Sequence, residues 1–118
     1  MNRQRILVVD DEVEIRDMCK RALEWAGYWV NVSQNAQEAL ELLDKEAYEL
    51  VLTDLNLPGL NGLELISEAK KKHPHCKTLL MTGTPRGNNK RTDTSACLRK
   101  PFGFMELILK IEKLLSSP

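Results

Sequence analysis

The chain has 118 residues, enough for one domain with a sizeable hydrophobic core but too few for a second independent module. Lysine plus arginine and aspartate plus glutamate number 17 each, so the balanced charge excludes a general electrostatic attraction to nucleic acid or to an acidic membrane surface. The three cysteines are widely spaced and form no CxxC pair, which argues against a disulfide framework or a thiolate zinc site and favours buried, reduced thiols.

No apolar run approaches the length of a membrane span, and the first residues, MNRQR, lead directly into a strand pattern without the apolar core of a secretion signal. We therefore expect a cytoplasmic protein that contacts neither a membrane nor nucleic acid directly. Its specificity must come from the local arrangement of side chains.

Short apolar runs alternate along the chain with amphipathic stretches. The strand patterns cover residues 6–9, 28–32, 50–53, 78–81 and 97–99. Apolar residues recur at helical spacing over residues 15–26, 36–47, 63–69 and 104–115. This alternation predicts a parallel sheet with helices on both faces, since parallel strands need right-handed crossovers. The expected fold class is α/β, a doubly wound parallel sheet of about five strands.

The segment from Gly83 to Ser95 breaks the alternation. It has no large apolar side chain, and it contains Pro85, Gly87 and two asparagines. Because nothing in it could anchor an amphipathic helix to the sheet, we expect the helix due in this place to be shortened, irregular or disordered.

Five polar residues follow the ends of the predicted strands. Asp10 and Asp11 follow the first strand, Asp54 the third, Thr82 the fourth and Lys100 the fifth. In open α/β sheets, ligands bind at the carboxyl ends of the strands, near the point where the strand order reverses. We therefore expect these side chains to converge on one site.

The predicted site would crowd three carboxylates, and two carboxylates about 4 Å apart repel by about 4 kcal/mol at an effective dielectric near 20. A hard divalent ion such as Mg²⁺ would relieve this repulsion, because it prefers one or two carboxylates, water and phosphate oxygens. A carboxylate can also attack a phosphoryl group to give an aspartyl phosphate. In that chemistry Thr82 and Lys100 would bind the transferred oxygens.

Simpler structural roles remain for the three aspartates. Asp10 or Asp11 could cap the first helix, and Asp54 could belong to a turn. His73 and His75 lie at a lysine-rich helix end, where we expect them to be solvated. The sequence is less compatible with a flavin carrier or a hydrolase of the same architecture. Asp-Asp-Glu at the first strand end would repel a phosphate group unless a metal ion lay between them.

Four motifs in order resemble the receiver domain of two-component response regulators. They are ILVVDDE, VLTDLNLPGLNG, a lone threonine at a strand end (Thr82), and Lys100-Pro101 followed by Phe102. The resemblance covers nearly the whole chain. It implies one receiver domain over residues 1–118, with a flavodoxin-like sheet.

The resemblance also implies the roles of the site residues. Asp54 would accept a phosphoryl group from a sensor histidine kinase or a phosphotransfer protein. Asp11 and Asp54 would bind Mg²⁺ directly, Asp10 largely through water, and Asn56 through its backbone carbonyl. A cis peptide bond before Pro101 would aim Lys100 into the site. Such a domain hydrolyses its own phosphoaspartate, so it is a phosphotransfer catalyst of limited turnover and not a metabolic enzyme.

The chain departs from this family at two places. Receivers usually have an aromatic residue three positions before the motif lysine, where this chain has Cys97, and the segment after Thr82 is irregular. These departures motivate an alternative, a degenerate receiver that acts as a binding or dimerisation module without phosphorylation. The sequence leaves open the kinase, the output partner, a homodimeric state, and whether the chain stands alone or belongs to a longer regulator.

Overall fold

A parallel sheet of five strands, in the order β2-β1-β3-β4-β5, forms the centre of the computed structural model. The structure describes residues 3–83 and 96–117. The strands are β1 (Arg5–Val9), β2 (Trp29–Ser33), β3 (Leu50–Asp54), β4 (Lys77–Thr82) and β5 (Ala96–Arg99). The helices in these ranges are α1 (Val13–Trp25), α2 (Ala36–Lys45), α3 (Gly62–Lys72) and α4 (Phe104–Leu115). None of these helices is long and apolar enough to cross a bilayer.

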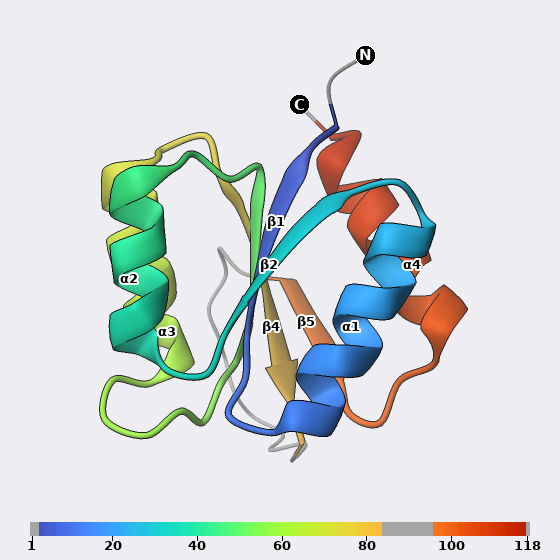
Figure 1. The fold of residues 1–118 in the computed structure, drawn as a ribbon, viewed down its shortest axis with the longest axis horizontal. Helices are drawn as coiled ribbons and strands as arrows, with labels where there is room; N and C mark the ends of the chain where they lie inside the picture. Colours follow the sequence, from blue (N-terminus) through green and yellow to red (C-terminus); the bar gives the residue numbers. More distant parts are fainter. Residues whose placement is uncertain (1–2, 84–95, 118) are drawn as a thin grey trace.

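The helices cover both faces of the sheet, with α2 and α3 on one side and α1 and α4 on the other (Figure 1). The side chains of the interior strand β1 explain why both faces are covered. Its side chains alternate, so that Ile6 and Val8 pack into the cluster that includes α1 and α4, while Leu7 and Val9 pack into the cluster that includes α2 and α3. All four side chains are fully buried, which confirms the prediction of a strand with a layer on each face.

The predicted fold class, a doubly wound five-stranded α/β domain, is confirmed, and the differences are local. The second helical pattern reached Ala47, but α2 ends at Lys45 because the backbone of Glu46 is already extended. The expectation of a buried thiol is wrong for Cys97, which is exposed, whereas Cys19 and Cys76 are buried. Cys97 lies on the edge strand β5, where the side chain of its neighbour Leu98 takes the buried position.

The predicted irregular segment lies between β4 and β5. Apart from Gly83, it falls outside the described residues, since the description resumes at β5. The expectation of a shortened, irregular or disordered helix there therefore remains a prediction.

The turn after β3 leads from Asp54, at the end of the strand, into α3. Gly59 has a φ of 80°, a left-handed conformation that favours glycine. Helix α3 then begins with a capping box, in which Asn61 accepts from the Glu64 N–H and Glu64 accepts from the Asn61 N–H. Gly62 packs so closely that a Cβ atom added to it would lie 2.3 Å from the backbone oxygen of Asp54.

This close approach makes Gly62 a sensitive position. We expect Gly62→Ala to lower the free energy of unfolding by about 1–3 kcal/mol, because the methyl group would push on backbone rather than on a flexible side chain. Urea unfolding measures the effect. Gly83→Ala is the matched control, since an added Cβ there meets nothing within 4 Å, and equal losses for the two variants would contradict the explanation.

Candidate functional site

The site lies where the strand order reverses. Strand β1 lies between β2 and β3, so the chain first moves from β1 to β2 and then crosses back over β1 to β3. In open α/β sheets, ligands bind beyond the carboxyl ends of the strands at such a reversal. Asp10 directly follows β1, and Asp54 is the last residue of β3. The register pairs Val9 with Thr53, which places the two aspartates next to each other at this edge.

Three carboxylates meet at this edge. Asp10, Asp11 and Asp54 each offer an oxygen, and these oxygens all lie within 4.8 Å of one another. Asp10 is completely buried and Asp54 is 7% exposed, while Asp11 faces solvent. The predicted convergence of the three acidic residues is therefore present in the structure.

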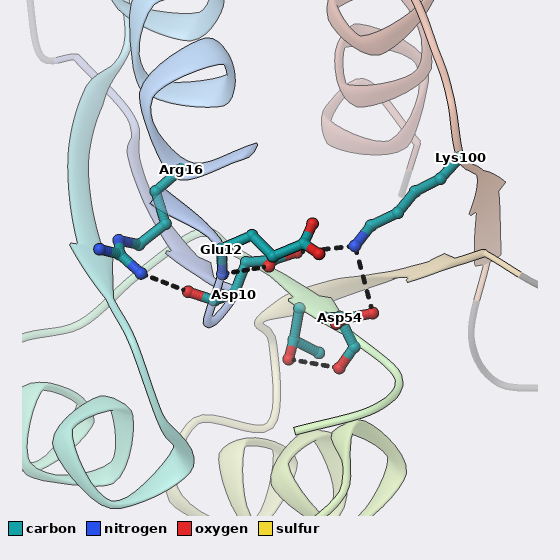
Figure 2. Close-up of polar contacts among 6 residues, drawn as sticks. Asp10, Glu12, Arg16, Asp54 and Lys100 are labelled. Atoms are coloured by element: carbon teal, nitrogen blue, oxygen red, sulfur yellow. Dashed lines mark hydrogen bonds and ion pairs between the residues drawn. The ribbon is translucent and has the colours of Figure 1, made fainter. Parts of the chain in front are cut away.

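Lys100 reaches into this acidic cluster from the segment after β5. Its Nζ donates to Asp10 Oδ2 at 3.0 Å and lies 3.5 Å from Asp54 Oδ1 (Figure 2). The side chain is only 16% exposed. One ammonium group thus bridges the carboxylate that follows β1 and the carboxylate that ends β3, and it offsets part of their mutual repulsion.

The pKa of Asp54 is raised above its ordinary value. Burial is the main cause, and the charge of Asp10 adds to it, while the charge of Lys100 and a hydrogen bond from the Asn56 backbone N–H oppose it. The pKa of Lys100 is also raised. Burial alone would lower it, but the hydrogen bond to Asp10 and the charges of Asp10, Asp54 and Glu12 outweigh burial.

Asp10 does not cap α1, so that structural interpretation is wrong for this residue. The N-cap residue is Glu12, whose side chain makes no capping hydrogen bond. Asp10 Oδ1 instead accepts from the Glu12 N–H at 2.9 Å, outside the helix. The Asp10 carboxylate therefore has a separate partner for each oxygen, the Glu12 amide and Lys100.

Thr82 and Asn56 lie at the same edge. Thr82 is the last residue of β4, and its backbone oxygen accepts from the Lys100 N–H at 2.8 Å. Asn56 follows Asp54 by two residues and is exposed, and its backbone N–H limits the rise in the pKa of Asp54. The Lys100–Pro101 peptide bond is cis, as the resemblance implied.

The structure gives one residue a different role from the predicted one, and it adds one residue that the sequence analysis missed. His73 is not simply solvated, because its Nε2 lies 2.7 Å from the Leu43 carbonyl oxygen and so joins the ends of α3 and α2. Arg16 was not predicted at all, although its guanidinium donates to the Asp10 carbonyl oxygen at 2.8 Å. A contact from a side chain to backbone leaves no periodic signal in the sequence.

The donor set suits a hard divalent cation. All the side-chain donors of the cluster are carboxylate oxygens, which Mg²⁺ and similar ions prefer. A cation here would also reduce the repulsion that remains between the carboxylates after Lys100 has made its two contacts. The residues at the end of the sheet therefore fit a metal site of this kind.

The chain belongs to the response regulator receiver domain family, which it matches over residues 6–112. It is 35% identical over 118 residues to the response regulator receiver protein CpdR of Brucella abortus, a match that covers 95% of this chain and 97% of CpdR. A solved receiver domain protein (CheY-like) from Methanospirillum hungatei has 34% identity and a TM-score of 0.87, covering 97% of this chain and 94% of that one. The CheY-like, flavodoxin-like fold and the family follow from these matches.

Other relatives are longer than this chain. The transcriptional regulatory protein CpxR homolog of Haemophilus influenzae is 35% identical over 117 residues, and the match covers 94% of this chain but 50% of that protein. The chain thus spans about half the length of some curated relatives.

The raised pKa of Asp54 gives a test of the site's electrostatics. The pKa of this carboxyl is higher in the folded protein than in the unfolded chain. Its ionisation therefore lowers the free energy of unfolding as the pH rises from the ordinary aspartate pKa through the raised value. Without divalent ions, Asp54→Asn should therefore be more stable than wild type at pH 7, and the difference should shrink as pH falls toward 4. Urea unfolding at both pH values measures this difference.

The control is Asp17→Asn, which removes an exposed carboxylate from α1. This control should track the wild type at both pH values. If Asp54→Asn is no more stable than wild type at pH 7, burial and the charge of Asp10 do not raise the pKa of Asp54 as described.

Proposed function

We propose that residues 1–118 form one receiver domain of a two-component system, in which Asp54 accepts a phosphoryl group in a Mg²⁺-dependent reaction. The single observation that supports this most strongly is the contact of Lys100 with both Asp10 and Asp54 beside three converging carboxylates. Membership of the receiver family supports the same assignment.

In the proposed reaction, an Asp54 carboxylate oxygen attacks the phosphorus atom of a phosphohistidine on a sensor kinase or phosphotransfer protein. A P–O bond forms and the P–N bond breaks, and its electron pair remains on the imidazole nitrogen. The Lys100 ammonium, 3.5 Å from Asp54 Oδ1, is placed to bind a phosphoryl oxygen. Thr82, at the end of β4, is proposed to hydrogen-bond another oxygen.

Asp10, Asp11, Asp54 and the backbone carbonyl of Asn56 are the residues proposed to hold the metal. Mg²⁺, when bound, would neutralise charge on the phosphoryl oxygens during transfer. The hydrogen bond from Lys100 and the bond from the Glu12 amide keep the Asp10 carboxylate at the edge of the sheet. Asp10 is thereby fixed before any ligand arrives, which reduces the cost of organising the site.

The same residues support slow hydrolysis of the phosphoaspartate, so the proposed domain is a switch and not a metabolic enzyme. We also propose that the domain is cytoplasmic. Cys19, Cys76 and Cys97 are free, and an exposed thiol such as that of Cys97 persists in a reducing compartment.

Mass spectrometry after incubation with acetyl phosphate and Mg²⁺ tests the proposal. Wild type should gain one phosphoryl group, and EDTA should prevent the gain. Asp54→Asn should gain none, because the nucleophile is gone, whereas Asp17→Asn should behave as wild type.

A folded wild-type protein that neither gains a phosphoryl group nor binds beryllofluoride with Mg²⁺ would overturn this proposal. That result would favour the alternative, a degenerate receiver that acts as a binding or dimerisation module without phosphorylation.

A further inference from the structure

Arg16 reaches back from the second turn of α1 to the loop that carries the acidic residues. Its Nη1 donates to the backbone oxygen of Asp10 at 2.8 Å (Figure 2). Asp10 lies between the end of β1 and the start of α1, so its carbonyl belongs neither to the strand nor to the helical hydrogen-bond ladder. The guanidinium therefore holds a backbone group of the loop that carries the acidic residues.

This contact completes the hydrogen bonding of Asp10. The Asp10 N–H donates to the Ser33 carbonyl at 3.1 Å, and its two carboxylate oxygens accept from the Glu12 N–H and from Lys100. With Arg16 on the carbonyl, every polar group of this fully buried residue has a partner. Such complete pairing is what a buried polar residue requires to hold one conformation.

The contact of Arg16 with the Asp10 carbonyl also restricts the next residue, Asp11. The carbonyl of Asp10 and the N–H of Asp11 share one rigid peptide plane, so fixing the carbonyl restricts the direction in which the chain continues through Asp11. Asp11 is exposed, yet its carboxylate lies in the cluster with Asp10 and Asp54. Of these three aspartates it is the one that packing holds least.

We propose that Arg16 is a positioning residue for the divalent-cation site. It orients the Asp10–Asp11 peptide so that the Asp11 carboxylate stays beside Asp10 and Asp54. This inference rests on the proposed function, because it concerns the same metal site.

Replacing Arg16 can change the metal affinity in either direction, and the direction shows whether its positioning or its charge matters more. Arg16 is a cation close to the acidic cluster, so its charge alone disfavours a second cation. Removal of the charge alone would make metal binding tighter. Loss of positioning would make it weaker, since supporting residues behind metal ligands typically change affinity by tenfold or more.

The experiment measures the affinity for Mn²⁺ alone, by the electron paramagnetic resonance signal of the free ion. Arg16→Met keeps a long apolar side chain but removes the donor and the charge. Its dissociation constant should be about tenfold higher than that of wild type. Arg21→Met, an exposed arginine on the same helix, is the matched control and should stay within about twofold of wild type.

A second variant and a second readout guard against a simple folding defect. Arg16→Lys keeps the charge and one donor group, and its dissociation constant should lie between those of wild type and Arg16→Met. Amide exchange of Glu12, whose N–H donates to Asp10, should be faster in Arg16→Met than in Arg21→Met. Neither readout depends on phosphorylation.

The failures of the two proposals are distinguishable. If folded wild type binds no Mn²⁺, the proposed function fails at its metal site. If wild type binds Mn²⁺ while Arg16→Met and Arg16→Lys bind it equally well or more tightly, the positioning role of Arg16 is overturned and the proposed function stands.

Discussion

The contact of Lys100 with two buried carboxylates is the interaction on which the site depends. Asp10 is wholly removed from water and Asp54 nearly so, and ionised carboxylates in such surroundings are costly unless they are paired. Lys100 supplies one positive charge to both of them. With Asp11 also in the cluster, the described residues at this edge still carry more negative than positive charge, which favours a further cation.

The fold creates this crowding through the order of its strands. Strands β1 and β3 are neighbours in the sheet, so residues that follow or end them come together although they are far apart in sequence. The turn after β3 is then fixed by backbone hydrogen bonds, from the Leu55 N–H to Met81 and from the Gly62 N–H to Leu55. The absence of a side chain at Gly62 lets α3 start directly against the backbone of Asp54. These backbone contacts hold the end of β3, and with it Asp54, in place.

Much of this arrangement could be predicted from the sequence because it follows from short-range patterns. The alternation of short apolar runs with amphipathic stretches predicts a parallel sheet with helices on both faces, and the rule for ligand sites in such sheets places Asp10, Asp54 and Lys100 at one edge. The contact of Arg16 could not be predicted, since a bond from a side chain to a backbone oxygen six residues earlier produces no periodicity. The bond of His73 to α2 was missed for a related reason, as it depends on how two helices pack.

The exposure of Cys97 shows another limit. A cysteine is usually buried, but on the edge strand β5 the alternation of side chains gave the buried position to Leu98. Composition alone could not tell which of the two neighbours faces the core. Predictions from strand order were therefore more reliable here than predictions from residue type.

The free energy of unfolding of Lys100→Met, with and without saturating Mg²⁺, tests most directly whether a cation relieves the crowding of these carboxylates. Without Mg²⁺ the variant should lose about 3 kcal/mol relative to wild type, because Asp10 would be left buried without its charged partner. Mg²⁺ should then stabilise Lys100→Met more than it stabilises wild type, since the ion takes over part of the role of the ammonium group. A smaller gain in the variant than in wild type, or no gain in either, would contradict this account.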